Sequence, residues 1–234
     1  MKRLLSILTI PFFVAACGGG GGGSSESSTT TPLTSTDTFQ LQKAYVSYVN
    51  DSSSRAFNIS GTASGDSLSG SGRATAGTLT AATFEGQSAL SKTQVVTGNI
   101  IRAGTSIPWS SSSTTYVDSA YKLLGSNGND EYIVVTSFSM PSDSVKVNAT
   151  GSFYSATRYT NSTKSSVIGT RTATYALEPD TSSTALLKFI LVEKNTSATT
   201  TSTVTSVFRV TPSGVVTPIS ETSTTSSQTI TITY

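Results

Sequence analysis

Residues 121–135 read YKLLGSNGNDEYIVV, and this stretch decides the fold class. Two short runs rich in apolar and aromatic residues, Tyr121–Leu124 and Tyr132–Val135, flank a polar break at 125–130. Runs of this length on either side of an Asn-Gly turn signal are typical of a β-hairpin. The stretch therefore predicts two antiparallel strands.

Strand patterns continue on both sides of this hairpin. Residues 186–192, LLKFILV, are apolar on both faces and predict a central strand. Residues 203–210 and 229–234 alternate apolar with hydroxylated or charged side chains, which predicts half-buried antiparallel strands. Residues 39–49 predict a long first strand. No helical period follows the N-terminal segment, so the expected fold is all-β.

The predicted all-β domain covers residues 37–234, as an antiparallel β-sandwich or β-barrel, and it is long enough to need no disulfide. Residues 61–86 are rich in Gly and Ser. Such strands specify register poorly, so we expect them at an exposed sheet edge or face. A weak similarity between 59–62 and 147–150 leaves open a division into two units near 108–125.

The amino-acid composition argues against several classes of function. The chain has 43 Ser and 41 Thr, only 12% charged residues and no histidine. Without histidine it lacks the commonest general base and metal ligand. Removing Lys2 and Arg3 with an N-terminal signal lowers the net charge from +2 to zero. A neutral, evenly mixed surface does not favour a nucleic-acid partner.

The N-terminal segment predicts export. Residues 1–16 combine a basic start, a short apolar run and small residues, which is typical of a secretory signal peptide. Val14-Ala15-Ala16-Cys17 resembles the lipobox of Gram-negative bacterial lipoproteins. That resemblance implies a lipid on Cys17, the only cysteine, together with cleavage before it and acylation of the new N-terminus by a fatty acid such as palmitate.

Residues 17–36 predict a disordered tether rich in Gly, Ser and Thr. A similar glycine run follows the lipidated cysteine in surface-displayed lipoproteins of the transferrin-receptor type. Gly18 after Cys17, in place of aspartate, implies sorting to the outer membrane. The expected partner is therefore that membrane, reached through the lipid anchor, with the domain on its periplasmic face or at the cell surface.

One segment suggests a ligand site. Trp109, the only tryptophan, follows Pro108 and precedes a serine run, with Tyr116 and Tyr121 further along. Exposed aromatic rings beside hydroxyl-rich loops can stack on sugar rings. Residues 107–121 are therefore a candidate loop for a glycan or protein ligand. The alternative is that Trp109 fills the core.

The sequence gives only weak signals for a catalytic or metal site. Gly65-Asp66-Ser67-Leu68 resembles the nucleophile motif of the GDSL hydrolases, which implies Ser67 as a nucleophile. Those enzymes need a histidine to take the serine proton, and this chain has none. The oxygen-bearing side chains of 127–131 do not have EF-hand spacing, and a turn explains them. We therefore expect no catalytic residue, no metal site and no cofactor.

These observations favour a non-enzymatic lipoprotein, anchored to the outer membrane, that acts as a structural or binding module. A surface adhesin that binds a glycan or host ligand is the alternative. A third hypothesis is a histidine-free hydrolase that uses Ser67 as its nucleophile.

Overall fold

A computed structural model describes residues 34–128 and 130–234. The predicted signal peptide, Cys17, tether residues 17–33 and Asn129 lie outside the described residues. The elements in chain order are α1 (Leu41–Asn50), β1 (Ser54–Ala63), β2 (Asp66–Ala76), β3 (Thr80–Phe84), β4 (Gln87–Arg102), β5 (Thr105–Val117), β6 (Leu123–Asn127), β7 (Tyr132–Phe138), β8 (Thr150–Tyr159), β9 (Val167–Pro179), β10 (Ala185–Lys194), β11 (Thr200–Val210), β12 (Val216–Thr224) and β13 (Gln228–Thr233).

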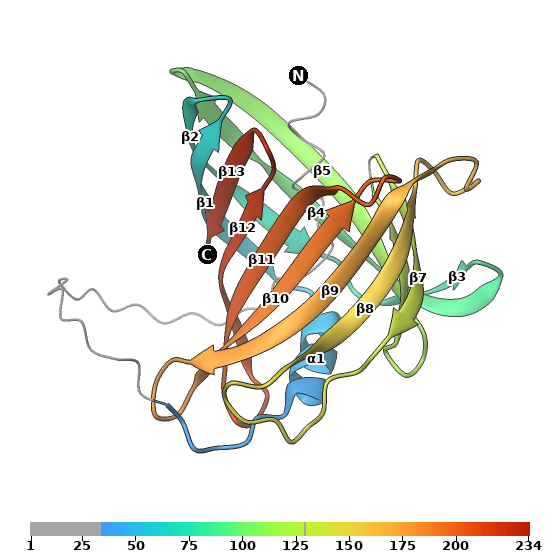
Figure 1. Cartoon of the computed structure of the whole chain (residues 1–234), viewed down its shortest axis with the longest axis vertical. Helices are drawn as coiled ribbons and strands as arrows, with labels where there is room; N and C mark the ends of the chain where they lie inside the picture. Colours follow the sequence, from blue (N-terminus) through green and yellow to red (C-terminus); the bar gives the residue numbers. More distant parts are fainter. Residues whose placement is uncertain (1–33, 129) are drawn as a thin grey trace, which may run out of the picture.

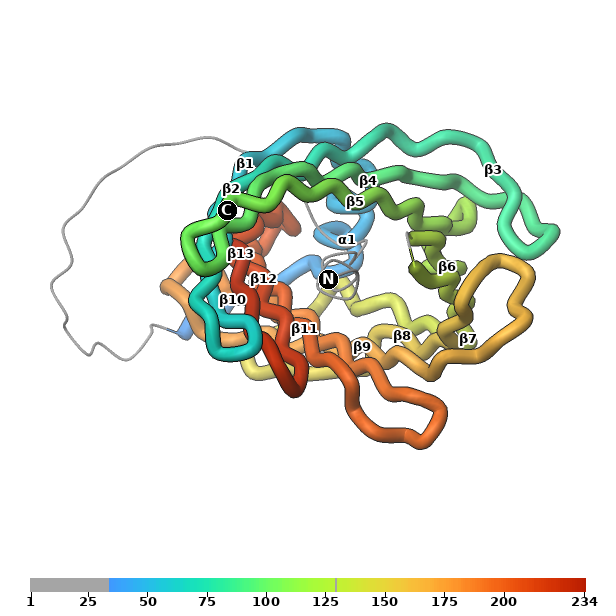
Figure 2. The backbone as a smooth tube through the Cα atoms, turned by 90° about the horizontal axis from the view of Figure 1, so that it is seen from above, coloured from blue at the N-terminus to red at the C-terminus, as the bar shows by residue number. Residues whose placement is uncertain are grey.

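The described strands form one antiparallel sheet in the order β2-β1-β13-β12-β11-β10-β9-β8-β7-β6-β5-β4-β3. A further pairing between β2 and β4 closes this sheet into a ring of 12 strands, and β3 lies outside the ring. Figure 1 shows the barrel from the side, and Figure 2 shows the ring from above. The all-β prediction is confirmed, and its barrel alternative is the correct one.

Strand alternation determines which side chains face the lumen. In β10, Leu187, Phe189 and Leu191 are buried while the residues between them are half-buried. β9 and β11 pair with β10 on either side, so the predicted central strand is confirmed. The alternating patterns near the C-terminus are confirmed as β11 and β13, in which Ile230 and Ile232 are buried.

The hairpin predicted at residues 121–135 is also confirmed, but its turn is not formed by Asn127-Gly128, because Asn127 is paired within β6. β6 begins at Leu123, and the last pair before the turn is Asn127 with Tyr132. The backbone N–H of Gly128 donates to the carbonyl of Glu131 at 2.9 Å. The turn therefore follows Asn127 and precedes Tyr132.

The predicted long first strand at 39–49 is wrong, and so is the expectation of no helix. Residues 41–50 form α1, whose buried residues are Leu41, Ala44, Tyr45, Tyr48 and Val49. That spacing of three and four residues places all five on one helical face. At ten residues α1 is short, and no helix in the described ranges is long and apolar enough to cross a membrane.

α1 lies inside the ring, as Figure 2 shows. Its buried face joins the largest hydrophobic cluster, which includes inward-facing residues of β8 to β11. Tyr45 meets Phe153 edge-on, with ring centroids 5.4 Å apart, and Tyr48 meets Phe208 at 6.2 Å. The helix therefore forms part of the core of the barrel.

The expectation that the Gly- and Ser-rich segment 61–86 lies at an exposed sheet edge or face is met at its end, where β3 is an edge strand, but β1 and β2 are not edge strands. β1 pairs with β13 and β2, and β2 also pairs with β4. A Cβ on Gly72 would lie 2.5 Å from the ring of Phe57, so the missing side chain leaves room for that ring. The sheet is also continuous through residues 108–125, because β5 pairs with both β4 and β6.

The position of Tyr45 allows a test of the helix inside the barrel. Its ring is buried, and its hydroxyl has no hydrogen-bond partner among the described residues. We expect Tyr45→Ala to lower the free energy of unfolding by about 3 to 5 kcal/mol, as truncation of a buried aromatic ring does. Tyr45→Phe keeps the ring and removes the unpaired hydroxyl, so it should be neutral or stabilising. Urea unfolding of both variants measures the difference, and equal losses would contradict the packing described.

Candidate functional site

The lumen holds a lysine that the sequence analysis did not single out. Lys92 lies on β4, between the half-buried, inward-facing Leu90 and Gln94. Its Nζ donates to the backbone carbonyls of Tyr48 at 3.2 Å and Val49 at 3.0 Å. It also lies 5.4 Å from the centroid of the Tyr48 ring. Lys92 therefore binds the carbonyls at the C-terminal end of α1, where a cation is favoured.

A cavity lies beside this contact, with a volume of about 30 Å³. Ligand pockets for drug-sized molecules measure about 300 to 1,000 Å³. This cavity is far below that range, so in this region the helix fills the lumen. The lining residues come from α1, β4, β5 and the segment before β3: Tyr45, Tyr48, Val49, Leu79, Lys92, Gln94, Thr115 and Val117.

Burial affects the charge of Lys92. Desolvation lowers the pKa of Lys92 to about 8, although the nearby Asp51 carboxylate raises it. Arg55 adds a smaller lowering effect. The amino group is therefore mostly protonated at neutral pH, and it acts as a cation that binds the two helix carbonyls.

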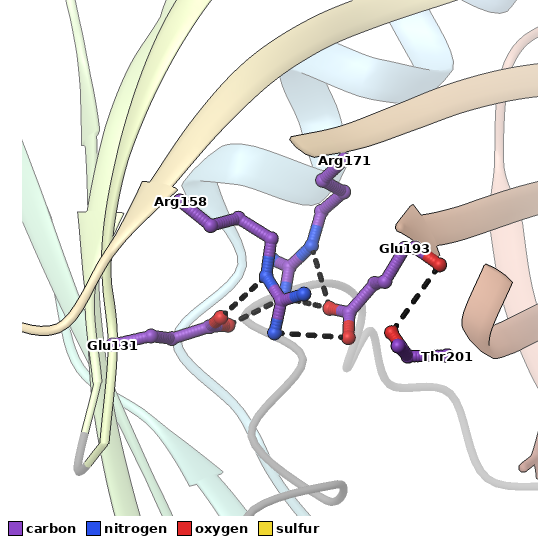
Figure 3. Close-up of polar contacts among 5 residues, drawn as sticks. All are labelled: Glu131, Arg158, Arg171, Glu193 and Thr201. Carbon is purple, nitrogen blue, oxygen red and sulfur yellow. Dashed lines mark hydrogen bonds and ion pairs between the residues drawn. The ribbon is translucent and has the colours of Figure 1, made fainter. Parts of the chain in front are cut away.

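Four charged residues form a second polar cluster, shown in Figure 3. Arg158 on β8 donates through Nε to Glu131 at 2.8 Å and pairs through Nη2 with Glu193 at 3.1 Å. Arg171 on β9 binds the same two carboxylates and is only 2% exposed. Each guanidinium thus bridges both carboxylates. The cluster ties β8, β9 and β10 to the turn between β6 and β7.

The two arginines and two glutamates of this cluster carry opposite charges that offset one another. Burial opposes ionisation of Glu131, but the guanidinium groups of Arg171 and Arg158 outweigh it and lower the pKa of Glu131. Burial also disfavours the charge of Arg171, but the carboxylates of Glu131 and Glu193 raise its pKa. The Glu131 carboxylate is therefore held as a counter-ion by two arginines. Across residues 34–128 and 130–234, no group of three or more His, Cys, Asp or Glu is arranged to hold a metal ion.

Glu221 is a buried carboxyl group that forms no hydrogen bond with a basic side chain in the described part of the chain. Ser206 Oγ donates to Glu221 Oε2 at 3.1 Å. Desolvation raises the pKa of Glu221 to about 7, and the bond from Ser206 only partly offsets this effect. Ser206 is 1% exposed, so a substrate cannot reach this serine–carboxylate contact.

The loop expected at 107–121 is wrong, because residues 107–117 belong to strand β5. Trp109 belongs to strand β5 and is 5% exposed. Its ring centroid lies 6.4 Å from that of Phe57, and both rings belong to a second hydrophobic cluster at one side of the barrel. A Cβ on Gly98 would lie 3.2 Å from Trp109 Nε1, so this glycine accommodates the indole ring. The core alternative for Trp109 is the correct one.

Tyr116 and Tyr121, the other two candidate ligand-binding residues, do not lie beside Trp109. Tyr116 stacks on Phe84 with ring centroids 4.6 Å apart, in a cluster separate from that of Trp109. Tyr121 precedes β6, and its hydroxyl donates to Asn50 Oδ1 at 3.4 Å. The structure therefore does not bring Trp109, Tyr116 and Tyr121 together as one ligand-binding surface.

The serine of the GDSL-like motif lies within β2, with its side chain exposed. The neighbouring Asp66 accepts a hydrogen bond from Arg102 Nε at 2.8 Å. Ser67 lies within an antiparallel pair of strands, opposite Thr62 of β1. The local structure therefore does not resemble a nucleophile site.

The burial of Trp109 predicts a large effect of truncation. We expect Trp109→Ala to lower the free energy of unfolding by about 3 to 5 kcal/mol. The exposed neighbour Ser110 gives the control, because Ser110→Ala should change it by less than about 0.5 kcal/mol. Since Trp109 is the only tryptophan, acrylamide should quench the fluorescence of the folded chain poorly. Efficient quenching with an unchanged stability would contradict the buried position.

The low pKa of Lys92 predicts a pH dependence of stability. A lysine in an unfolded chain has a pKa of about 10.4. Between pH 8 and about 10.4, residue 92 therefore binds more protons in the unfolded chain than in the folded chain. Lys92 should therefore make stability rise with pH across that window. Lys92→Met should remove this contribution, whereas Lys122→Met at an exposed position should not. Urea unfolding at several pH values gives the curves, and parallel curves for wild type and Lys92→Met would refute the assignment.

Comparisons with known proteins give no match for this chain. No protein-family model matches it, and neither the curated proteins nor the solved structures include a significantly similar chain.

Proposed function

We propose that the chain is a non-enzymatic lipoprotein, anchored to the outer membrane, whose barrel acts as a structural or binding module. The observation that carries this proposal is the filled lumen. α1 packs against the inner wall, Lys92 binds the end of the helix, and the adjoining cavity has only about 30 Å³. A barrel filled in this way is a rigid body that offers its loops and outer wall for contacts.

The N-terminal residues support the anchored location. Cys17 is the only cysteine and follows a lipobox-like sequence, and 17–36 provide a tether before the barrel. Several fatty chains on one residue give stable attachment, where a single chain gives only marginal binding. In this proposal the lipid holds the protein at the membrane, and the tether separates the barrel from the bilayer.

The buried charges support a structural role over a catalytic one. The carboxylates of Glu131 and Glu193 pair with arginines, and Glu221 accepts a hydrogen bond from the inaccessible Ser206. An adhesin that stacks a glycan on Trp109 is not part of the proposal, because that ring is buried. A ligand would instead have to contact the outer wall or the loops.

The anchor can be tested in a Gram-negative host. Cys17→Ser removes the only thiol that can carry the lipid, so the variant should lose palmitate labelling and should not be processed at residue 17. Ser24→Ala, in the same tether, should label and fractionate with the outer membrane like the wild type. If Cys17→Ser keeps its label and its membrane fraction, the lipoprotein proposal fails.

A further inference from the structure

β3 has an open edge. Within residues 34–128 and 130–234, each of the 12 strands in the ring pairs on both sides, whereas β3 pairs only with β4. β3 and β4 form a hairpin with Phe84 opposite Gln87, and the two turn residues Glu85 and Gly86 have φ values of 51° and 76°. Positive φ at both positions is the signature of a tight two-residue turn.

This turn determines which backbone groups are unpaired. The residues that flank a two-residue turn exchange hydrogen bonds, and bonded and non-bonded pairs then alternate along the hairpin. Phe84, Ala82 and Thr80 therefore bond to β4, while the N–H and C=O groups of Ala81 and Thr83 point away from it. Among the described residues, no backbone group bonds to Ala81 or Thr83 on that side.

The hairpin is held firmly in place. The Phe84 ring stacks on Tyr116 and Tyr132, with centroid distances of 4.6 and 5.4 Å. Glu85 accepts a hydrogen bond from the Tyr132 hydroxyl at 2.8 Å and forms an ion pair with Lys164. The open edge of β3 is therefore presented by an ordered strand.

β3 also lacks the features that normally protect an edge strand. Charged side chains, proline and β-bulges prevent edge-to-edge pairing in natural sheets. β3 reads TAATF, contains none of these residue types and pairs with β4 without a register shift. Ala81 and Thr83 are exposed, and the charge of Glu85 is balanced by Lys164.

We propose that β3 pairs antiparallel with β3 of a second copy of this chain. The unpaired backbone groups of Ala81 and Thr83 are placed symmetrically about Ala82. Ala81 of each copy would therefore exchange two backbone hydrogen bonds with Thr83 of the other copy. The two Ala82 residues would then lie opposite each other, where small side chains allow close approach. The contact is isologous, as in two-fold dimers.

The size of this contact determines how it should be detected. Interfaces below about 1,200 Å² form weak or transient complexes, and two five-residue strands fall in that class. A covalent link accumulates even a short-lived pair of copies, so it can detect a weak contact in solution. Covalent trapping is therefore the appropriate measurement.

A single engineered cysteine can report the register. In the full chain carrying Cys17→Ser, Ala82→Cys provides the only thiol. Opposite residues of a non-hydrogen-bonded pair have Cα atoms about 4.5 Å apart, within the range that a disulfide spans. Mild oxidation should therefore give a disulfide-linked dimer of Ala82→Cys. Ala81→Cys and Thr83→Cys should give little dimer, because their symmetry mates would lie about 9 Å apart.

A second substitution tests the edge itself. Thr83→Pro removes an N–H that β4 does not use, so it should abolish crosslinking of Ala82→Cys while leaving the barrel folded. Thr83→Val keeps the N–H and should crosslink normally. Circular dichroism and urea unfolding check that each variant is folded. Absence of the Ala82→Cys dimer, equal crosslinking at all three positions, or crosslinking that persists in Thr83→Pro would overturn the proposal.

Discussion

A ring of 12 strands encloses more space than the side chains of its own wall can fill, and the rest of the structure depends on how that space is occupied. Barrels of about eight strands are filled by their own side chains, whereas wider ones enclose cavities or channels. Here α1 occupies part of that space, and Tyr45 and Tyr48 make edge-on contacts with Phe153 and Phe208. Lys92 fixes the end of the helix. The wall and the helix therefore stabilise each other.

The buried ion pairs inside the barrel link residues of several strands. A buried ion pair loses hydration, and replacing it with apolar residues is often neutral or stabilising. The bridging of Glu131 and Glu193 by Arg158 and Arg171 requires β8, β9, β10 and the turn before β7 to be aligned as they are. A shift of one residue in β9 would turn Arg171 to the outer face and leave the carboxylates buried with one partner fewer.

The sequence predicts the strands well because their alternation is local, as in β11 and β13. It fails at residues 41–50, where Leu41, Tyr45 and Val49 fit an alternating pattern, although Ala44 and Tyr48 complete the three- and four-residue spacing of a helical face. It also fails for Trp109, whose neighbours Gly98 and Phe57 are brought there by pairing across β4, β2 and β1. Lys92 could have been found, since it falls on the inward side of its strand next to Leu90. The arginine–glutamate cluster depends on contacts distant in sequence.

Closure of the ring also explains why β3 is exposed. The first part of β4, residues 87–91, extends beyond the segment that pairs with β2, which begins at Gln94. β3 therefore pairs with β4 beyond the end of β2, and none of the described strands lies on its other side. Phe84 turns toward the outer wall and packs against Tyr116 and Tyr132, so that the hairpin lies against the barrel. The pairing that removes the edges of 12 strands thus leaves one short strand with an unpaired edge, held rigidly at the outer surface.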